Sequence, residues 1–161
     1  MPLCNPSDLK GLLAPGERLL GLDLGTKTIG LALSDTRLLI ASPLRTIRRT
    51  RFRADAAALL GDVATHRVGG LVIGLPIQLD GHEGPRAQSA RQFARNLLAI
   101  RDIAIAFWDE RLSTAAVERD MIAADLTRKR RGEIVDRSAA AYILQGLLDR
   151  LAAAARDPAP G

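Results

Sequence analysis

Asp23 lies in the middle of an apolar run, GLDLG (21–25), with a leucine on either side. A solvated surface acid is not expected at such a position, and burying a carboxylate without a partner is costly. A metal ion, a cation or a network of hydrogen bonds would compensate this cost, and glycines at 21, 25 and 30 would let a ligand approach the backbone. The alternative is an acid on an edge strand that faces water, but we favour a functional Asp23.

Three further acids could converge with Asp23. Asp109 and Glu110 directly follow the apolar run IAIAFW (103–108), and open sheets place ligand sites at such strand ends. Strand alternation puts one of the two, and not both, on the Asp23 side of the sheet, but the pattern does not choose between them. Asp136 comes four residues before Ala140, which places it near the inward stripe of a helix. The helix dipole explains an acid there equally well.

Carboxylates gathered from several segments are typical of nucleases that depend on divalent metal. Mg²⁺ prefers hard oxygen ligands, and two metals about 4 Å apart can clamp both reacting oxygens of a phosphodiester. The formal charge of +5 and the pI of about 10.3 favour an anionic partner, nucleic acid first. Two basic runs, RTIRRTRFR (45–53) and RKRR (128–131), could serve it, although charge runs are often plain solvated surface.

Composition limits the other classes of function. The 161 residues are 47% hydrophobic and 3% aromatic, which predicts one domain with an aliphatic core. Cys4 is the only cysteine, so the sequence offers neither an internal disulfide nor a Cys/His zinc site. Without an apolar run long enough for a membrane span or a secretory signal, we expect a cytoplasmic protein that does not enter membranes.

The elements that must position these acids follow from the hydrophobic pattern. Short apolar runs predict strands at 17–25, 28–35 and 38–47, joined by tight turns and therefore antiparallel. The period then becomes helical over 52–66, and strands at 71–75 and 103–108 alternate with helices from Pro85, over 113–124, and along the C-terminal segment. We expect a mixed sheet flanked by helices in one domain, residues 18–155, after a loose lead-in (1–17) and before a disordered tail (156–161).

Four segments together resemble one family. They are GLDLGTKTIGLALSD (21–35), VIGLPIQLDGHEGPRAQSARQFARNL (72–97), WDERLSTAAVE (108–118) and RKRRGEIVDRSAAAYILQGLLD (128–149). Their order and spacing are similar to those of the bacterial YqgF-type proteins, which are described as pre-16S ribosomal RNA nucleases and formerly as Holliday-junction-resolvase-like. The resemblance implies a ribonuclease H-like α/β fold with a five-stranded mixed sheet, three strands antiparallel and two parallel. It also implies trimming of the 5′ end of precursor 16S ribosomal RNA in the cytoplasm.

The same resemblance implies a site. It places the family's catalytic acids, as ligands of Mg²⁺ or Mn²⁺, on Asp23, Glu110 and Asp136, and so selects Glu110 over Asp109. The residues that we expect to contact phosphates are Lys27, Arg111, Arg128, Lys129, Arg130 and Arg131. The chain departs from related patterns at three places: Thr28 in place of a second basic residue, Gly74-Leu75-Pro76 in place of an acid after the fourth strand, and Ala139-Ala140 in place of polar metal ligands.

Three other functions fit parts of the sequence. GLDLGTKTIG (21–30) also resembles the first phosphate loop of the actin and hexokinase proteins, but those need two domains and a second glycine-rich loop, which this chain lacks. A non-catalytic RNA-binding factor in ribosome biogenesis could keep the fold without turnover. A Holliday-junction-type DNA resolvase would normally act as a symmetric dimer. The sequence leaves monomer and homodimer open, and RNA is the favoured partner.

Overall fold

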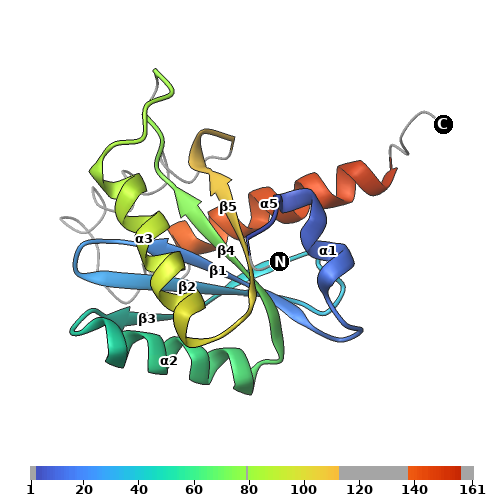
Figure 1. Ribbon diagram of the computed structural model, residues 1–161. Coiled ribbons are helices and arrows are strands. Elements are labelled where there is room, and N and C mark those ends of the chain that lie inside the picture. Colours follow the sequence, from blue (N-terminus) through green and yellow to red (C-terminus); the bar gives the residue numbers. More distant parts are fainter. Residues whose placement is uncertain (1–2, 79, 113–137, 157–161) are drawn as a thin grey trace, which may run out of the picture.

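The protein is represented by a computed structural model that describes residues 3–78, 80–112 and 138–156 (Figure 1). These residues form a five-stranded sheet of order β3-β2-β1-β4-β5. The strands are β1 (Arg18–Leu24), β2 (Thr28–Ser34), β3 (Ala41–Arg48), β4 (Val68–Leu75) and β5 (Ala104–Asp109). The first three are antiparallel neighbours, whereas β4 is parallel to both β1 and β5. The predicted mixed sheet is confirmed.

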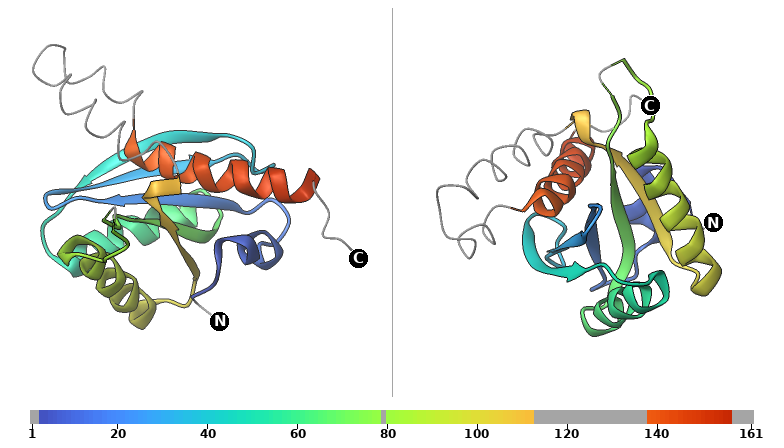
Figure 2. Two further views of the ribbon diagram at one scale, coloured as in Figure 1. Left: turned by 90° about the horizontal axis from the view of Figure 1, so that it is seen from above. Right: turned by 90° about the vertical axis from the view of Figure 1, so that its left-hand side faces the viewer.

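Helices cover both faces of this sheet. α2 (Phe52–Thr65) and α3 (Pro85–Ile100) pack on one face, and α5 (Ala139–Arg156) packs on the other, as the right-hand view of Figure 2 shows. Local sequence sets two of the helix starts. Pro85 at the first position of α3 has no amide hydrogen to leave unpaired, and the Ser138 hydroxyl accepts a hydrogen bond from the Ala141 amide at the start of α5. The helix predicted over 113–124 lies outside the described residues.

Because both faces are covered, the central strands carry apolar side chains on both sides. One core cluster joins the sheet to α2 and α3, for example through Leu22, Leu59 and Leu97. The second joins it to α5, for example through Val72 and Leu144. We call the side of the sheet that carries this second cluster the α5 face.

α5 approaches β1 unusually closely. A Cβ atom built on Gly21 would lie 2.8 Å from Leu144 Cβ and 3.0 Å from the Ala140 carbonyl oxygen. A side chain at position 21 would therefore push the helix away from the sheet, which gives this glycine a packing role. The close approach fixes the first turns of α5 above the carboxyl half of β1, the part that carries Asp23.

The N-terminal segment differs from the expected loose lead-in. Leu3 forms an isolated bridge with Ile105, and the Cys4 amide donates a 3.0 Å hydrogen bond to the Ile105 carbonyl. The segment continues through η1 (Pro6–Asp8) and α1 (Leu9–Leu12), and the Leu9 side chain is fully buried. It thus lies along part of the β5 edge, where an uncovered strand would leave backbone groups unpaired.

The last described element of the chain is the helix α5. α5 runs to Arg156, and residues 157–161 of the predicted tail lie outside the described residues. None of the helices in the described part combines the length and the apolar character needed to cross a membrane.

Candidate active site

Asp23 lies on the α5 face of β1. Alternation along the strand sends Leu20 and Leu22 to the opposite core cluster and puts Gly21 and Asp23 toward α5. The Asp23 side chain is half-buried, and Asp23 pairs with Gly30 on β2. A Cβ atom built on Gly30 would lie 3.7 Å from both Asp23 Cβ and Ala140 Cβ. The carboxylate therefore projects beside the first turns of α5.

Glu110 lies on the same face. Trp108, near the end of β5, belongs to the core cluster under α5, and Glu110 begins the 3-10 helix η2 (Glu110–Leu112) that directly follows β5. Its side chain is only 3% exposed, and its Oε1 atom lies 2.8 Å from the position that a Cβ on Gly74 would occupy. Glu110 thus faces α5, where the family resemblance expects the second acid.

Asp109 points away from this face and has a different partner. Its carboxylate accepts hydrogen bonds from the Arg111 side chain at 2.7–3.1 Å and from the Arg111 amide at 2.9 Å. The hydrogen bonds from the Arg111 guanidinium hold the pKa of Asp109 below its usual range, and they raise the pKa of Arg111 in turn. Asp109, at the end of β5, and Arg111, in the 3-10 helix that follows it, therefore form a local ion pair.

Gly74 on β4 lies between the two acids on the α5 face. Leu22 of β1 pairs with Ile73, which brings Asp23 level with Gly74, and Gly74 itself pairs with Trp108 of β5. Since glycine has no side chain, nothing from β4 separates the carboxylates on this face. The oxygen donors of Asp23 and Glu110 are of the type that Mg²⁺ and Mn²⁺ prefer, so the residues present fit a divalent cation.

The third predicted acid, Asp136, lies outside the described residues. Ala140, four residues later in the chain, lies beside Gly30 and hence beside the pair of Gly30 with Asp23. Within the described ranges, no group of three or more His, Cys, Asp or Glu side chains could hold a metal ion. The described part of the chain thus contributes two of the three predicted ligands.

The predicted phosphate contacts fall into three groups. Lys27 is exposed in the turn between β1 and β2, and its carbonyl accepts a 2.9 Å hydrogen bond from the Arg49 amide. Arg111 lies next to Glu110, but its guanidinium is already paired with Asp109. The basic run Arg128, Lys129, Arg130 and Arg131 lies outside the described residues.

Two arginines whose side chains donate hydrogen bonds to the backbone at the end of β1 were not predicted from the sequence. Arg49 donates a 2.7 Å hydrogen bond from Nη1 to the Gly25 carbonyl, and Arg86 Nη2 lies 3.4 Å from the Leu24 carbonyl. Arg49 belongs to the basic run 45–53, which gave a weak signal. Arg86, in the first turn of α3, had no local signal, because only the fold brings that turn to β1.

Comparison with known proteins places the chain in a family. Residues 17–150 match the RuvX family, which is described as Holliday junction resolvase. The chain belongs to this family. A relative from Paramagnetospirillum magneticum is 61% identical over 149 residues, covering 92% of this chain and 96% of the relative. One from Rhodospirillum rubrum is 55% identical over 152 residues, covering 94% of each chain. Both relatives carry the name "Putative pre-16S rRNA nuclease".

The chain also resembles a solved resolvase in fold. RuvC from T. thermophilus, in complex with a Holliday junction substrate, superposes with a TM-score of 0.50 at 12% identity, over 84% of this chain and 96% of that chain. At such identity the likeness concerns the fold alone, and it confirms the predicted ribonuclease H-like architecture. The family description and the relatives' names denote enzymes that cut nucleic acids, in agreement with the predicted class of enzyme.

Proposed function

We propose that this protein hydrolyses phosphodiester bonds in RNA, with Mg²⁺ or Mn²⁺ held by Asp23, Glu110 and Asp136. The observation that carries the proposal is that Asp23 and Glu110, which come from distant segments, lie on the same face of the sheet at the level of Gly74. Both side chains offer the hard oxygen donors that a divalent cation prefers.

Each residue then has a defined task. When bound, the divalent cation supplies Lewis-acid polarisation of the phosphate and activation of water. Asp23 and Glu110 hold it on the α5 face, where α5 and β5 fix the buried Glu110 carboxylate. Asp136 supplies the third carboxylate, and Lys27 contacts a neighbouring phosphate from the β1–β2 turn. Arg111 and the run 128–131 complete the predicted phosphate contacts.

The substrate that we favour is the 5′ region of precursor 16S ribosomal RNA, in the cytoplasm. The relatives that are more than half identical to this chain over nearly its whole length carry a name referring to that RNA. The net charge of +5 agrees with a polyanionic substrate.

A four-way DNA junction is the second candidate, because the family description names a Holliday junction resolvase. The third possibility is an RNA-binding factor without turnover. One set of substrates separates the three: labelled precursor 16S RNA, an unrelated single-stranded RNA and a four-way DNA junction, each incubated with Mg²⁺, Mn²⁺ or a chelator.

The decisive variant is Asp23→Asn. We expect it to fold and to lose metal-dependent cleavage by at least about a hundredfold, since the amide is a poor substitute for a ligating carboxylate. Asp102→Asn is the matched control, because Asp102 is an exposed acid just before β5, at the opposite end of that strand from Glu110. The control should cleave at the wild-type rate. Wild-type cleavage by folded Asp23→Asn would refute the site, cleavage of the junction alone would assign the enzyme to DNA, and RNA binding without cleavage would leave the non-catalytic factor.

A further inference from the structure

A pocket of about 540 Å³ opens at the end of β1, on the side of the sheet that carries α3. Three segments form it: the β1–β2 turn, the connection from β3 to α2 and the first turn of α3. The polar residues that line it are Thr26, Arg49, Thr50, Arg86 and Ser89, and the backbone of Gly25 completes the wall. Its volume falls in the range of about 300–1,000 Å³ that is usual for ligand pockets.

The part of the pocket lining that the structure describes is positively charged, because it contains two arginines and no acid. The acid beside it, Asp55, is buried and accepts hydrogen bonds from the Thr50 amide and hydroxyl. Among the described residues, neither Arg49 nor Arg86 forms an ion pair with a carboxylate: their hydrogen-bond acceptors are the carbonyls of Gly25 and Leu24. Arg49 also lies 5.9 Å from the centroid of the Phe93 ring. A carbonyl or a ring orients a guanidinium but does not neutralise it, so within the described ranges both positive charges are available to a ligand.

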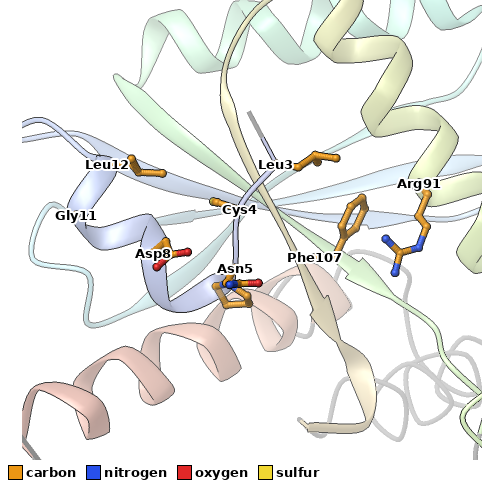
Figure 3. A pocket seen from close by; sticks show the side chains of 9 residues that line it. Leu3, Cys4, Asn5, Asp8, Gly11, Leu12, Arg91 and Phe107 are labelled. Carbon is orange, nitrogen blue, oxygen red and sulfur yellow. The ribbon is translucent and has the colours of Figure 1, made fainter. Parts of the chain in front are cut away.

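Three other arginines of the described part are paired with carboxylates. Arg45 pairs with Asp62 and Arg111 with Asp109. A larger cavity of about 900 Å³ lies between the N-terminal segment, β5 and α3, and Figure 3 shows Arg91 there beside the Phe107 ring. Arg91, however, is bound through two 2.6 Å hydrogen bonds to Glu83. The larger cavity therefore does not offer a free positive charge, whereas the smaller pocket offers two.

The smaller pocket and the candidate active site lie at the same end of β1. Leu24 and Gly25, which line it, directly follow Asp23 in the chain. Asp23 faces α5, whereas Leu24 packs with the cluster on the α3 side. The pocket and the acidic site thus lie on the two sides of the same strand end, and in Figure 1 the β1–β2 turn lies beside the start of α3.

We propose that this pocket binds a phosphate group of the RNA strand next to the one that is cut. Phosphate oxygens accept hydrogen bonds, and guanidinium groups are the donors that recognise them best. A strand that passes over the end of β1 would place one phosphate at the acids and a neighbouring one between Arg49 and Arg86. The inference rests on the proposed function, because it assumes that nucleic acid passes over the end of β1. The group bound is an internal phosphodiester or a terminal phosphate, which share this chemistry.

The test measures RNA binding rather than cleavage. Binding of a short single-stranded RNA is followed by fluorescence anisotropy in the presence of a chelator, at a series of salt concentrations. Arg86→Ala is the main variant, because Arg86 is exposed and contributes nothing to the core. Arg95→Ala is the matched control: it removes the same charge from an exposed position further along α3.

We expect Arg86→Ala to weaken binding about tenfold at low salt, as for the loss of a charged hydrogen bond. The slope of log affinity against log salt should become shallower by about 0.7, the value for one phosphate contact on a single strand. Arg49→Gln should act in the same direction, and thermal unfolding verifies its fold, since Arg49 also fixes the turn. Arg95→Ala should keep the affinity and slope of the wild type.

The outcomes separate this inference from the proposed function. If Arg86→Ala binds like Arg95→Ala, or if the wild type shows no salt-dependent RNA binding, the pocket does not bind phosphate. If the Arg86 effect is present but the wild type cleaves nothing, the phosphate site stands and the catalytic proposal fails. RNAs with a 5′-phosphate and a 5′-hydroxyl identify the group: equal losses indicate an internal phosphodiester, and a loss confined to the first indicates a terminal phosphate.

Discussion

Replacing Gly74 by alanine would place a methyl group between the two acids of the candidate site. The added Cβ would lie 2.8 Å from Glu110 Oε1 and in collision with Ile143 Cδ1. Ile143 is fully buried and Glu110 nearly so, which leaves neither side chain much space to move. We therefore expect Glu110 to shift out of its position, or α5 to lift from β4.

The size of the effect follows from two opposing terms. Overpacking by one methyl group lowers the free energy of unfolding by about 1–3 kcal/mol. Alanine in place of glycine within a strand raises it by about 0.5–1 kcal/mol, because the unfolded chain has less conformational freedom to lose. A net loss of about 1–2 kcal/mol corresponds to a decrease in melting temperature of about 2–8 °C for a domain of this size. Gly30→Ala is the matched control on the same face, because its Cβ would meet neighbours only at 3.7 Å.

Three measurements test this reasoning: thermal unfolding, Mn²⁺ binding by electron paramagnetic resonance, and cleavage well below the melting temperature. Gly74→Ala should bind Mn²⁺ more weakly and cleave more slowly than its folded fraction explains, whereas Gly30→Ala should unfold at or slightly above the wild-type temperature. A Gly74→Ala protein with wild-type stability and wild-type Mn²⁺ affinity would show that the space above Gly74 is not what positions Glu110.

Three further variants address charged residues. Glu110→Gln should lose far more cleavage than Asp109→Asn, since Glu110 faces Asp23 and Asp109 pairs with Arg111 on the other side; the reverse order would mean that Asp109 is the ligand. The hydrogen bonds from Arg91 lower the pKa of Glu83, so this pair stabilises the fold above the ordinary pKa of glutamate and ceases to do so as the pH falls through the lowered value. Because both side chains are about one-third exposed, Glu83→Gln should cost only about 0.5 kcal/mol at neutral pH and nothing in acid; a difference in melting temperature that is constant over that range would contradict this assignment.

The sequence by itself determined the order and type of the five strands and of α2, α3 and α5. Strands over 17–25 and 28–35 and the helix over 52–66 correspond within a few residues to β1, β2 and α2. Local hydrophobic period and turn residues carry this information, because they report which side chains a segment can bury. The sequence also identified Asp23 as a candidate functional residue, because it is an acid with apolar residues on both sides.

The choice between Asp109 and Glu110 needed more than the strand pattern. The sheet is covered on both faces, so β5 is apolar on both sides, and alternation gives no sign of which face meets α5. The family resemblance selected Glu110, and the tertiary structure places Glu110 on the α5 face because Trp108 packs there. The role of Glu110 as a ligand stays a prediction that the variants above test.

Only the tertiary structure decided which segments that are distant in the sequence pack against one another. The proline- and glycine-containing N-terminus looked like a loose lead-in, yet Leu9 is buried where α1 packs on the sheet. Arg86 is an ordinary helix-start residue in the sequence, and it becomes part of a positive pocket because α3 begins beside the end of β1. Such contacts join residues that are far apart in the chain. A local sequence pattern reports only on neighbouring residues, so it cannot predict these contacts.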